Sequence, residues 1–277
     1  MGRDWENRVR HSPLSRSGPA AGPPPLIAVA HGSSDPRAAA TVDALLDMVR
    51  HRAVQAGYPG LDVRAAYLGH AAPTLRQALV ALDRDAVVLP LLLTAAYHSK
   101  ADIPGVLREL HTARPRLAVS YGRTLGPHPL LLRALERRLA QIPDGRFSAG
   151  QFAPRETAVV LAAAGSSDPA ANGVITDLAG GWQAQRGWRA VLPAYASAAT
   201  PTPADAVAAA RRAGARHVLV ASYLLSPGIF ADQVRRDCLA AGADGVSPVL
   251  GAAPEIADVV LGRYAETFAD RRAAAAG

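Results

Sequence analysis

Two histidines stand where short apolar runs of the sequence end. His31 directly follows the run 26–30, and His98 follows the run 86–93. Neutral imidazoles suit divalent Fe, Co, Ni or Zn better than Mg or Ca. Because two protein ligands leave coordination positions of a metal open, the pair indicates a site for catalysis or for metal transfer, not a closed structural site.

The chain repeats itself, and the second copy lacks both histidines. AHGSSDP at 30–36 returns as AAGSSDP at 163–169, and three further blocks return in the same order at a nearly constant offset. Ala164 stands in place of His31, and Phe230 lies nearest to the position of His98. A lone histidine is more often a satisfied polar residue than a ligand. The absence of both from the sister copy favours a functional pair.

Apolar runs alternate with longer amphipathic segments along the chain. The predicted strands span residues 26–30, 63–67, 86–93, 117–121, 157–163, 189–195, 217–225 and 245–250. Such alternation is typical of parallel α/β sheets. We therefore predict an α/β fold of two tandem-duplicated domains, each a four-stranded parallel sheet flanked by helices. In a 2-1-3-4 strand order, strands 1 and 3 are neighbours, so His31 and His98 are expected to face one crevice.

The domain boundaries follow from the repeat. We predict an N-terminal domain with the metal site at 26–145 and a degenerate C-terminal copy at 155–277. Residues 1–25 show no periodicity and end in three prolines, which predicts a disordered tail. The tail lacks the apolar core of an export signal, and no apolar run is long enough for a transmembrane helix. The expected location is cytoplasmic.

The charge of the chain is uneven. Residues 26–150 carry fifteen Lys and Arg against ten Asp and Glu, whereas residues 151–277 carry eleven of each. Without basic runs interleaved with aromatic residues, nucleic acid is a poor partner, and an acidic small molecule is a better one. A solvated, arginine-rich surface explains the excess equally well. The single cysteine, Cys238, excludes an internal disulfide framework and a zinc site built on thiolates.

Three motifs carry a resemblance to a known family. AHGSSDP at 30–36, PLLLTAAYHSKADIP at 90–104 and LGPHPLLL at 125–132 resemble the sirohydrochlorin chelatases of the class II chelatase superfamily, in their long two-domain form. The resemblance implies a lyase, a ferrochelatase or cobaltochelatase, that inserts Fe²⁺, or Co²⁺ or Ni²⁺, into sirohydrochlorin for sirohaem or cobalamin-type tetrapyrrole synthesis. It implies that His31 and His98 bind this metal and take part in its insertion, with no cofactor besides the substrate metal.

One departure from the family concerns a third ligand. Some members have a glutamate just after the second strand, where this chain has Gly69 and His70. We therefore expect no acidic ligand there, and His70 is a weak substitute. Four residues near the site are candidate substrate contacts, with structural turns or solvated helix starts as the alternative: Ser33, Ser34, Tyr97 and Lys100.

Other polar residues near the motifs have structural interpretations. Ser34 or Asp35 is expected to cap the helix that Pro36 begins, which we favour over anion binding by that loop. His128, before Pro129, is interpreted as the entry of a helix. Asp102 is interpreted as a residue that caps or precedes a helix, since the second copy keeps an acid there.

Two other functions compete with chelation. A metal-binding or tetrapyrrole-binding carrier without turnover would need the same histidines. A two-domain small-molecule sensor of the periplasmic-binding type is disfavoured by the missing export signal and by the paired histidines. The sequence does not identify the metal, because imidazole suits Fe²⁺, Co²⁺ and Ni²⁺ alike. It does not indicate the oligomeric state either.

Overall fold

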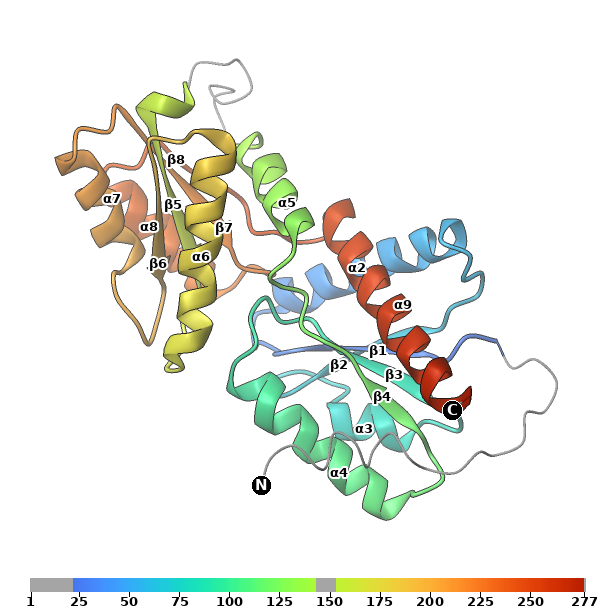
Figure 1. Ribbon diagram of the computed structural model, residues 1–277. Coiled ribbons are helices and arrows are strands. Elements are labelled where there is room, and N and C mark those ends of the chain that lie inside the picture. The colour runs from blue at the N-terminus through green and yellow to red at the C-terminus, as the bar shows by residue number, and fades with distance from the viewer. Residues whose placement is uncertain (1–21, 143–152, 277) are drawn as a thin grey trace. The chain divides into compact units, whose positions relative to one another are not determined.

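The computed structural model describes residues 22–142 and 153–276 (Figure 1). Most of the tail predicted at 1–25 lies outside the described residues. Its last residues are bound to the fold, because the Pro25 carbonyl accepts the Val87 N–H at 2.9 Å and the Pro24 carbonyl accepts the Tyr264 hydroxyl at 2.8 Å. Pro24 and Pro25, which the predicted tail includes, are therefore part of the fold.

The first sheet has the predicted strand order. Its strands are β1 (Leu26–Ala30), β2 (Val63–Tyr67), β3 (Ala86–Pro90) and β4 (Val119–Tyr121). They pair in parallel in the order β2-β1-β3-β4, which confirms the 2-1-3-4 prediction. Strands β1 and β3 are buried along their whole length. The edge where the strands end is thus the place where residues of different loops meet.

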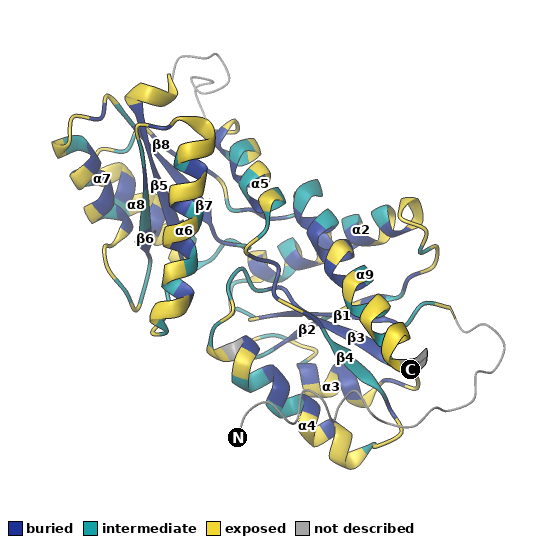
Figure 2. Ribbon diagram, in the orientation of Figure 1, coloured by how far each residue is buried: buried dark blue, intermediate teal, exposed yellow. Residues whose placement is uncertain are grey.

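Helices cover this sheet and bury its apolar face. They are α2 (Pro36–Gln55), α3 (Leu75–Val80), the π-helical turn η1 (His98–Asp102) and α4 (Ile103–Ala113). Leu79 of α3 and Ile103 of α4 pack with Ile27, Val29 and Val88 of the strands in one core. Figure 2 shows the result, with buried strands and helices whose outer faces are exposed.

The second copy builds the same architecture. Strands β5 (Thr157–Ala163), β6 (Ala190–Tyr195), β7 (His217–Tyr223) and β8 (Gly245–Val246) pair in parallel in the order β6-β5-β7-β8. The remaining elements are α5 (Pro129–Leu139), η2 (Pro154–Glu156), α6 (Pro169–Arg186), α7 (Pro203–Arg212), α8 (Ile229–Ala240) and α9 (Pro254–Ala276). The predicted fold class, two tandem four-stranded parallel sheets, is confirmed.

Some strands are shorter than predicted. The run at 245–250 forms only the two-residue strand β8. Ser247 still donates its N–H to the Val220 carbonyl at 2.8 Å, but the Ser222 N–H of β7 then bonds to the Ser247 hydroxyl at 3.0 Å and not to a backbone carbonyl. Apolar composition therefore overestimates the strand, because it does not record which residues find a hydrogen-bonding neighbour.

Contacts divide the chain into two compact units that differ from the predicted ranges. The first unit joins the described residues up to Ser34 with Val42–Leu125 and the chain from Ala257 onward. The second joins Asp35–Thr41 with the described residues of Gly126–Ile256. Helix α5 thus packs in the second unit, and most of α9 packs in the first.

Hydrogen bonds within each unit hold these two helices. In the first, buried Arg263 of α9 donates to the Thr124 carbonyl at 3.1 Å. In the second, Glu136 of α5 accepts the indole N–H of buried Trp182 at 3.0 Å. Sequence similarity between the copies does not reveal this arrangement, because a helix with an apolar stripe can cover either sheet.

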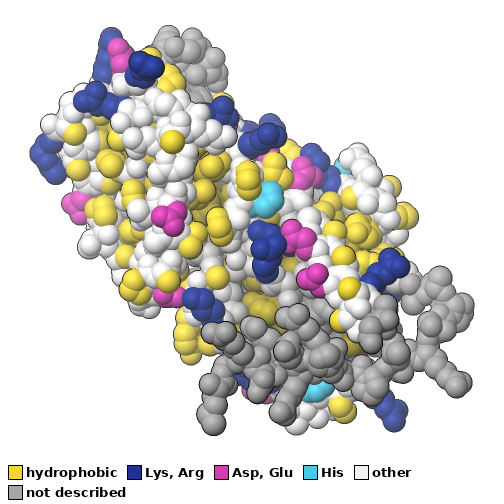
Figure 3. All heavy atoms as spheres, in the orientation of Figure 1, with side chains coloured by type: hydrophobic (Ala, Val, Ile, Leu, Met, Phe, Trp, Pro, Cys, Tyr) yellow, Lys and Arg dark blue, Asp and Glu magenta, His cyan; other side chains and the backbone are white. Residues whose placement is uncertain are grey.

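Basic side chains are dispersed over the face of the molecule that Figure 3 shows. On the face that Figure 3 shows, Lys and Arg side chains occur singly or in small groups among acidic ones. No helix of the described residues is long and apolar enough to cross a membrane. The cytoplasmic location, the lack of nucleic-acid and membrane partners, and the anionic ligand stay predictions.

Candidate active site

The loops after β1 and β2 touch at the edge where the strands end. Gly69 donates its N–H to the His31 carbonyl at 3.1 Å. Gly32 has a φ of 91°, and a Cβ atom there would lie 1.7 Å from the Gly69 carbonyl oxygen. Only glycine allows this approach. Gly165 repeats the arrangement against Ser197, so the close contact belongs to the fold in both copies.

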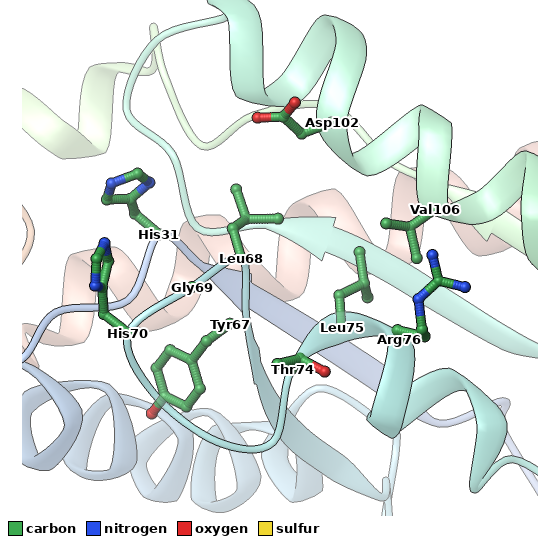
Figure 4. A pocket seen from close by; sticks show the side chains of 10 residues that line it. All are labelled: His31, Tyr67, Leu68, Gly69, His70, Thr74, Leu75, Arg76, Asp102 and Val106. Atoms are coloured by element: carbon green, nitrogen blue, oxygen red, sulfur yellow. The ribbon is translucent and has the colours of Figure 1, made fainter.

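A pocket of about 400 Å³ lies at this edge of the first unit (Figure 4). Its lining comprises His31, Tyr67, Leu68, Gly69, His70, Thr74, Leu75, Arg76, Asp102 and Val106. The side chains of His31 and His70 lie at one end of the view, Arg76 and Val106 at the other, and Leu68 and Leu75 between them. The pocket therefore joins imidazoles, an apolar middle and a guanidinium.

His70 occupies a backbone conformation that the fold imposes. Its φ is 59°, and the corresponding Ala198 of the second copy has a φ of 55°. Histidine is among the residues that enter this left-handed region more often than most. The conformation is thus shared by both copies, whereas the imidazole occurs only in the first. The structure places His70 in the same pocket as His31, a closer association than the sequence indicated.

The loop after β3 forms the turn η1, which begins at His98. Buried Ser99 donates its hydroxyl to the Ala96 carbonyl at 2.9 Å, and the Tyr121 hydroxyl of β4 donates to the Ser99 carbonyl at 2.9 Å. Burial raises the pKa of Tyr121, so its phenol remains a donor at neutral pH. Short π-helical segments occur frequently at functional sites. The pairing of His98 with His31 stays a prediction.

Asp102 closes η1 and lines the pocket. It occupies the N-cap position of α4, but its side chain makes no capping hydrogen bond. The expectation that Asp102 caps or precedes a helix is therefore met by its position before α4 and not by a side-chain cap. Within the part of the chain whose side chains are described, no three or more His, Cys, Asp or Glu residues gather to hold a metal.

The other polar residues singled out in the sequence either cap helices or lie outside the lining of the pocket. Asp35 accepts the Arg37 N–H at 2.9 Å and also its guanidinium, and these hydrogen bonds lower the pKa of the Asp35 carboxyl. Capping at this loop is confirmed. The Nδ1 atom of His128 accepts the Leu130 N–H at 3.1 Å, which confirms it as the entry of α5. The pocket lining does not include the predicted substrate contacts Ser33, Ser34, Tyr97 and Lys100, which stay predictions.

Sequence reasoning missed the apolar middle of the pocket and Arg76. Comparing the two copies position by position would have indicated them. Leu68, Leu75 and Arg76 correspond to Ala196, Pro203 and Ala204 in the second copy.

Tyr67 also lines the pocket. Burial raises the pKa of its phenol, and the charge of Asp43 raises it to a lesser extent, so this side chain stays protonated at neutral pH.

The family model named CbiX matches residues 25–142 and again residues 158–267. The chain belongs to the CbiX family. Each of the two matches covers one sheet, which agrees with a duplicated chain. The long two-domain form that the motifs indicated is confirmed.

Curated relatives of this CbiX-family chain carry chelatase names. The sirohydrochlorin ferrochelatase of Priestia megaterium is 27% identical over 175 residues, which are 62% of this chain and 63% of that protein. The alignment thus spans less than two thirds of that relative. The sirohydrochlorin cobaltochelatase of the same organism is 27% identical over 146 residues, 53% of this chain and 46% of that protein.

A solved structure shares the fold of this CbiX-family chain. "SirB from Bacillus subtilis with Fe3+" superposes with a TM-score of 0.73 at 23% identity, over 91% of this chain and 98% of that one. The likeness extends over both sheets, so the tandem α/β architecture is shared.

Proposed function

We propose that this protein is a lyase that inserts a divalent metal into sirohydrochlorin, with His31 and His98 as metal ligands. The observation that carries the proposal is the position of His31, an exposed imidazole at the end of β1 that lines a pocket with a second imidazole. The equivalent residue of the second copy is Ala164. The chelatase names of the relatives support the same reaction.

The metal is a substrate of this reaction. A set of imidazoles suits Fe²⁺, Co²⁺ and Ni²⁺, and the relatives are named for iron and for cobalt. We take Fe²⁺ as the first candidate, with Co²⁺ and Ni²⁺ as the alternatives. Open coordination positions let the pyrrole nitrogens replace water on the metal one after another.

Insertion exchanges one divalent cation for two pyrrole N–H protons. An imidazole whose lone pair holds the metal cannot accept a proton at the same time, so the protons need another acceptor. Asp102 is the one carboxylate among the described residues that line the pocket. We assign it the role of proton acceptor, from which the protons pass to water.

The test of the function is anaerobic incubation of the protein with sirohydrochlorin and Fe²⁺, Co²⁺ or Ni²⁺ in turn, followed by absorbance. We expect the wild type to accelerate insertion of at least one metal over the uncatalysed reaction. Binding of both substrates without acceleration would instead indicate the carrier function.

His31→Ala and His98→Ala should each lower the insertion rate about a hundredfold or more, because the remaining imidazole holds the metal poorly. The free energy of unfolding should change by no more than about 1 kcal/mol for His31→Ala, since alanine already occupies this backbone position at Ala164. His111→Ala, at an exposed position of α4, is the matched control and should leave the rate unchanged. Near-wild-type insertion by either site variant would remove that histidine from the site.

A further inference from the structure

Arg76 is held at the rim of the pocket by the start of α3. Thr74 caps this helix, with its N–H donating to the Gln77 side chain at 2.8 Å and its hydroxyl accepting the Gln77 N–H at 3.3 Å. Arg76 lies between these two residues, so the cap fixes its backbone. Figure 4 shows its side chain at the end of the pocket away from His31 and His70.

The partner of Arg76 leaves its guanidinium available. Arg76 pairs with Glu109 of α4, and the two side chains are 63% and 57% exposed. An exposed ion pair contributes little net free energy, because water solvates both charges. The guanidinium of Arg76 also has five N–H donors, and a single carboxylate occupies only some of them. A second carboxylate can therefore bind the guanidinium beside Glu109 or displace it.

The second copy shows that the fold does not require Arg76. Thr202 caps α7 as Thr74 caps α3, yet Ala204 stands at the position of Arg76. The apolar residues Leu68 and Leu75 likewise have smaller or different counterparts, Ala196 and Pro203. The copy with the imidazoles thus also has the cation and the two larger leucine side chains, which points to one ligand that contacts all three.

A ligand that fits this arrangement has an apolar body and an anionic group at its edge. We propose that Arg76 binds a peripheral carboxylate of the tetrapyrrole, which positions the macrocycle over Leu68 and Leu75 with its central nitrogens toward His31. Guanidinium pairs with carboxylate through two parallel hydrogen bonds, so the contact orients the ring as well as attracting it. This assignment rests on the proposed function, because it takes sirohydrochlorin as the substrate.

The test measures the KM for sirohydrochlorin, the kcat of Co²⁺ insertion, and the dissociation constants of sirohydrochlorin and of Co²⁺ separately. Arg76→Ala should raise the KM and the sirohydrochlorin dissociation constant about ten- to a hundredfold, the effect of a lost hydrogen bond to a charged group. The kcat and the Co²⁺ dissociation constant should stay within about twofold, since the metal end of the pocket is untouched. Arg76→Lys should recover part of the loss.

Two further variants sharpen the test. Glu109→Gln removes the competing carboxylate and should lower the KM, a change opposite in sign to that of Arg76→Ala. Arg123→Ala is the matched control, because Arg123 is an exposed arginine of the same unit, paired with exposed Glu266, and does not line the pocket. It should leave the KM within about twofold of the wild type.

Several outcomes would overturn the assignment. One is a sirohydrochlorin dissociation constant that responds equally to Arg76→Ala and Arg123→Ala. Another is a loss of Co²⁺ affinity in Arg76→Ala, which would place the residue at the metal end. If the wild type binds sirohydrochlorin but does not accelerate insertion, the proposed function fails while the binding measurements still decide the role of Arg76. If the wild type does not bind sirohydrochlorin, both proposals fall.

Discussion

At the scale of single residues, the two copies serve as controls for each other. Gly32 and Gly165 allow the same loop contact, and His70 and Ala198 share the same left-handed conformation. What differs is the side chain, an imidazole in the first copy and a methyl group in the second. The backbone of the site is therefore a property of the fold, and the chemistry is a property of a few substitutions.

His70→Gly should leave the free energy of unfolding unchanged or raise it by up to about 1 kcal/mol. A φ of 59° is strained for a residue with a Cβ atom and not for glycine, although glycine also makes the unfolded chain more flexible. Ala198→Gly, at a φ of 55°, is the matched control and should behave alike. Urea unfolding measures both. A loss of more than 1 kcal/mol in His70→Gly alone would show that the imidazole makes stabilising contacts.

At the scale of elements, the turn η1 connects the core to the site. It begins at His98 and ends at Asp102, and the hydroxyl of Tyr121 in β4 holds its Ser99 carbonyl. Because β4 is paired with β3, the turn is tied to the sheet that also positions His31. The backbone of the turn that carries His98 is therefore held by a hydrogen bond from a strand that carries neither predicted ligand.

Tyr121→Phe should weaken Co²⁺ binding severalfold and lower the free energy of unfolding by about 0.5–1.5 kcal/mol, the usual contribution of one hydrogen bond. Tyr195→Phe is the matched control, because the Tyr195 hydroxyl donates to the Asn172 carbonyl at 2.9 Å in the second unit. It should cost similar stability and leave Co²⁺ affinity unchanged. Equal Co²⁺ affinity in the two variants would mean that Tyr121 does not position the site. Metal titration and urea unfolding supply both quantities.

At the scale of the whole molecule, each compact unit combines segments that are distant in the sequence. Buried Tyr264 of α9 packs edge-on against Tyr58, with ring centroids 5.4 Å apart, and stacks on Phe268. All three residues belong to the first unit, as does Pro24, which accepts the Tyr264 hydroxyl. The first unit therefore needs the last helix of the chain to complete its core.

Tyr264→Ala should destabilise the first unit by about 3–5 kcal/mol, as expected for deleting a fully buried aromatic side chain. Cys238 reports on the second unit, because it is buried in that core and burial raises the pKa of its thiol to about 12. The thiol should resist alkylation until the second unit unfolds. In a denaturant series, Tyr264→Ala should lower the midpoint of Co²⁺ release and leave the midpoint of Cys238 alkylation in place.

Trp182→Ala should destabilise the second unit instead of the first. Trp182 is fully buried in the second unit and donates to Glu136 of α5. Its removal should shift Cys238 alkylation to lower denaturant. If Tyr264→Ala moved both midpoints equally, the two units would unfold as one cooperative body, contrary to the expectation.

The sequence alone determined the alternation of strands and helices, the duplication, the helix cap at Asp35 and the position of His31 at the end of β1. These features depend on local patterns and on the repeat, both of which are read along the chain. Only the tertiary structure decided that His70, Asp102 and Arg76 line one pocket with His31, and that α5 and α9 pack in the units they do. The physical reason is that α3 and α4 meet only after both pack on the sheet, and that an apolar helix face does not specify which sheet it covers.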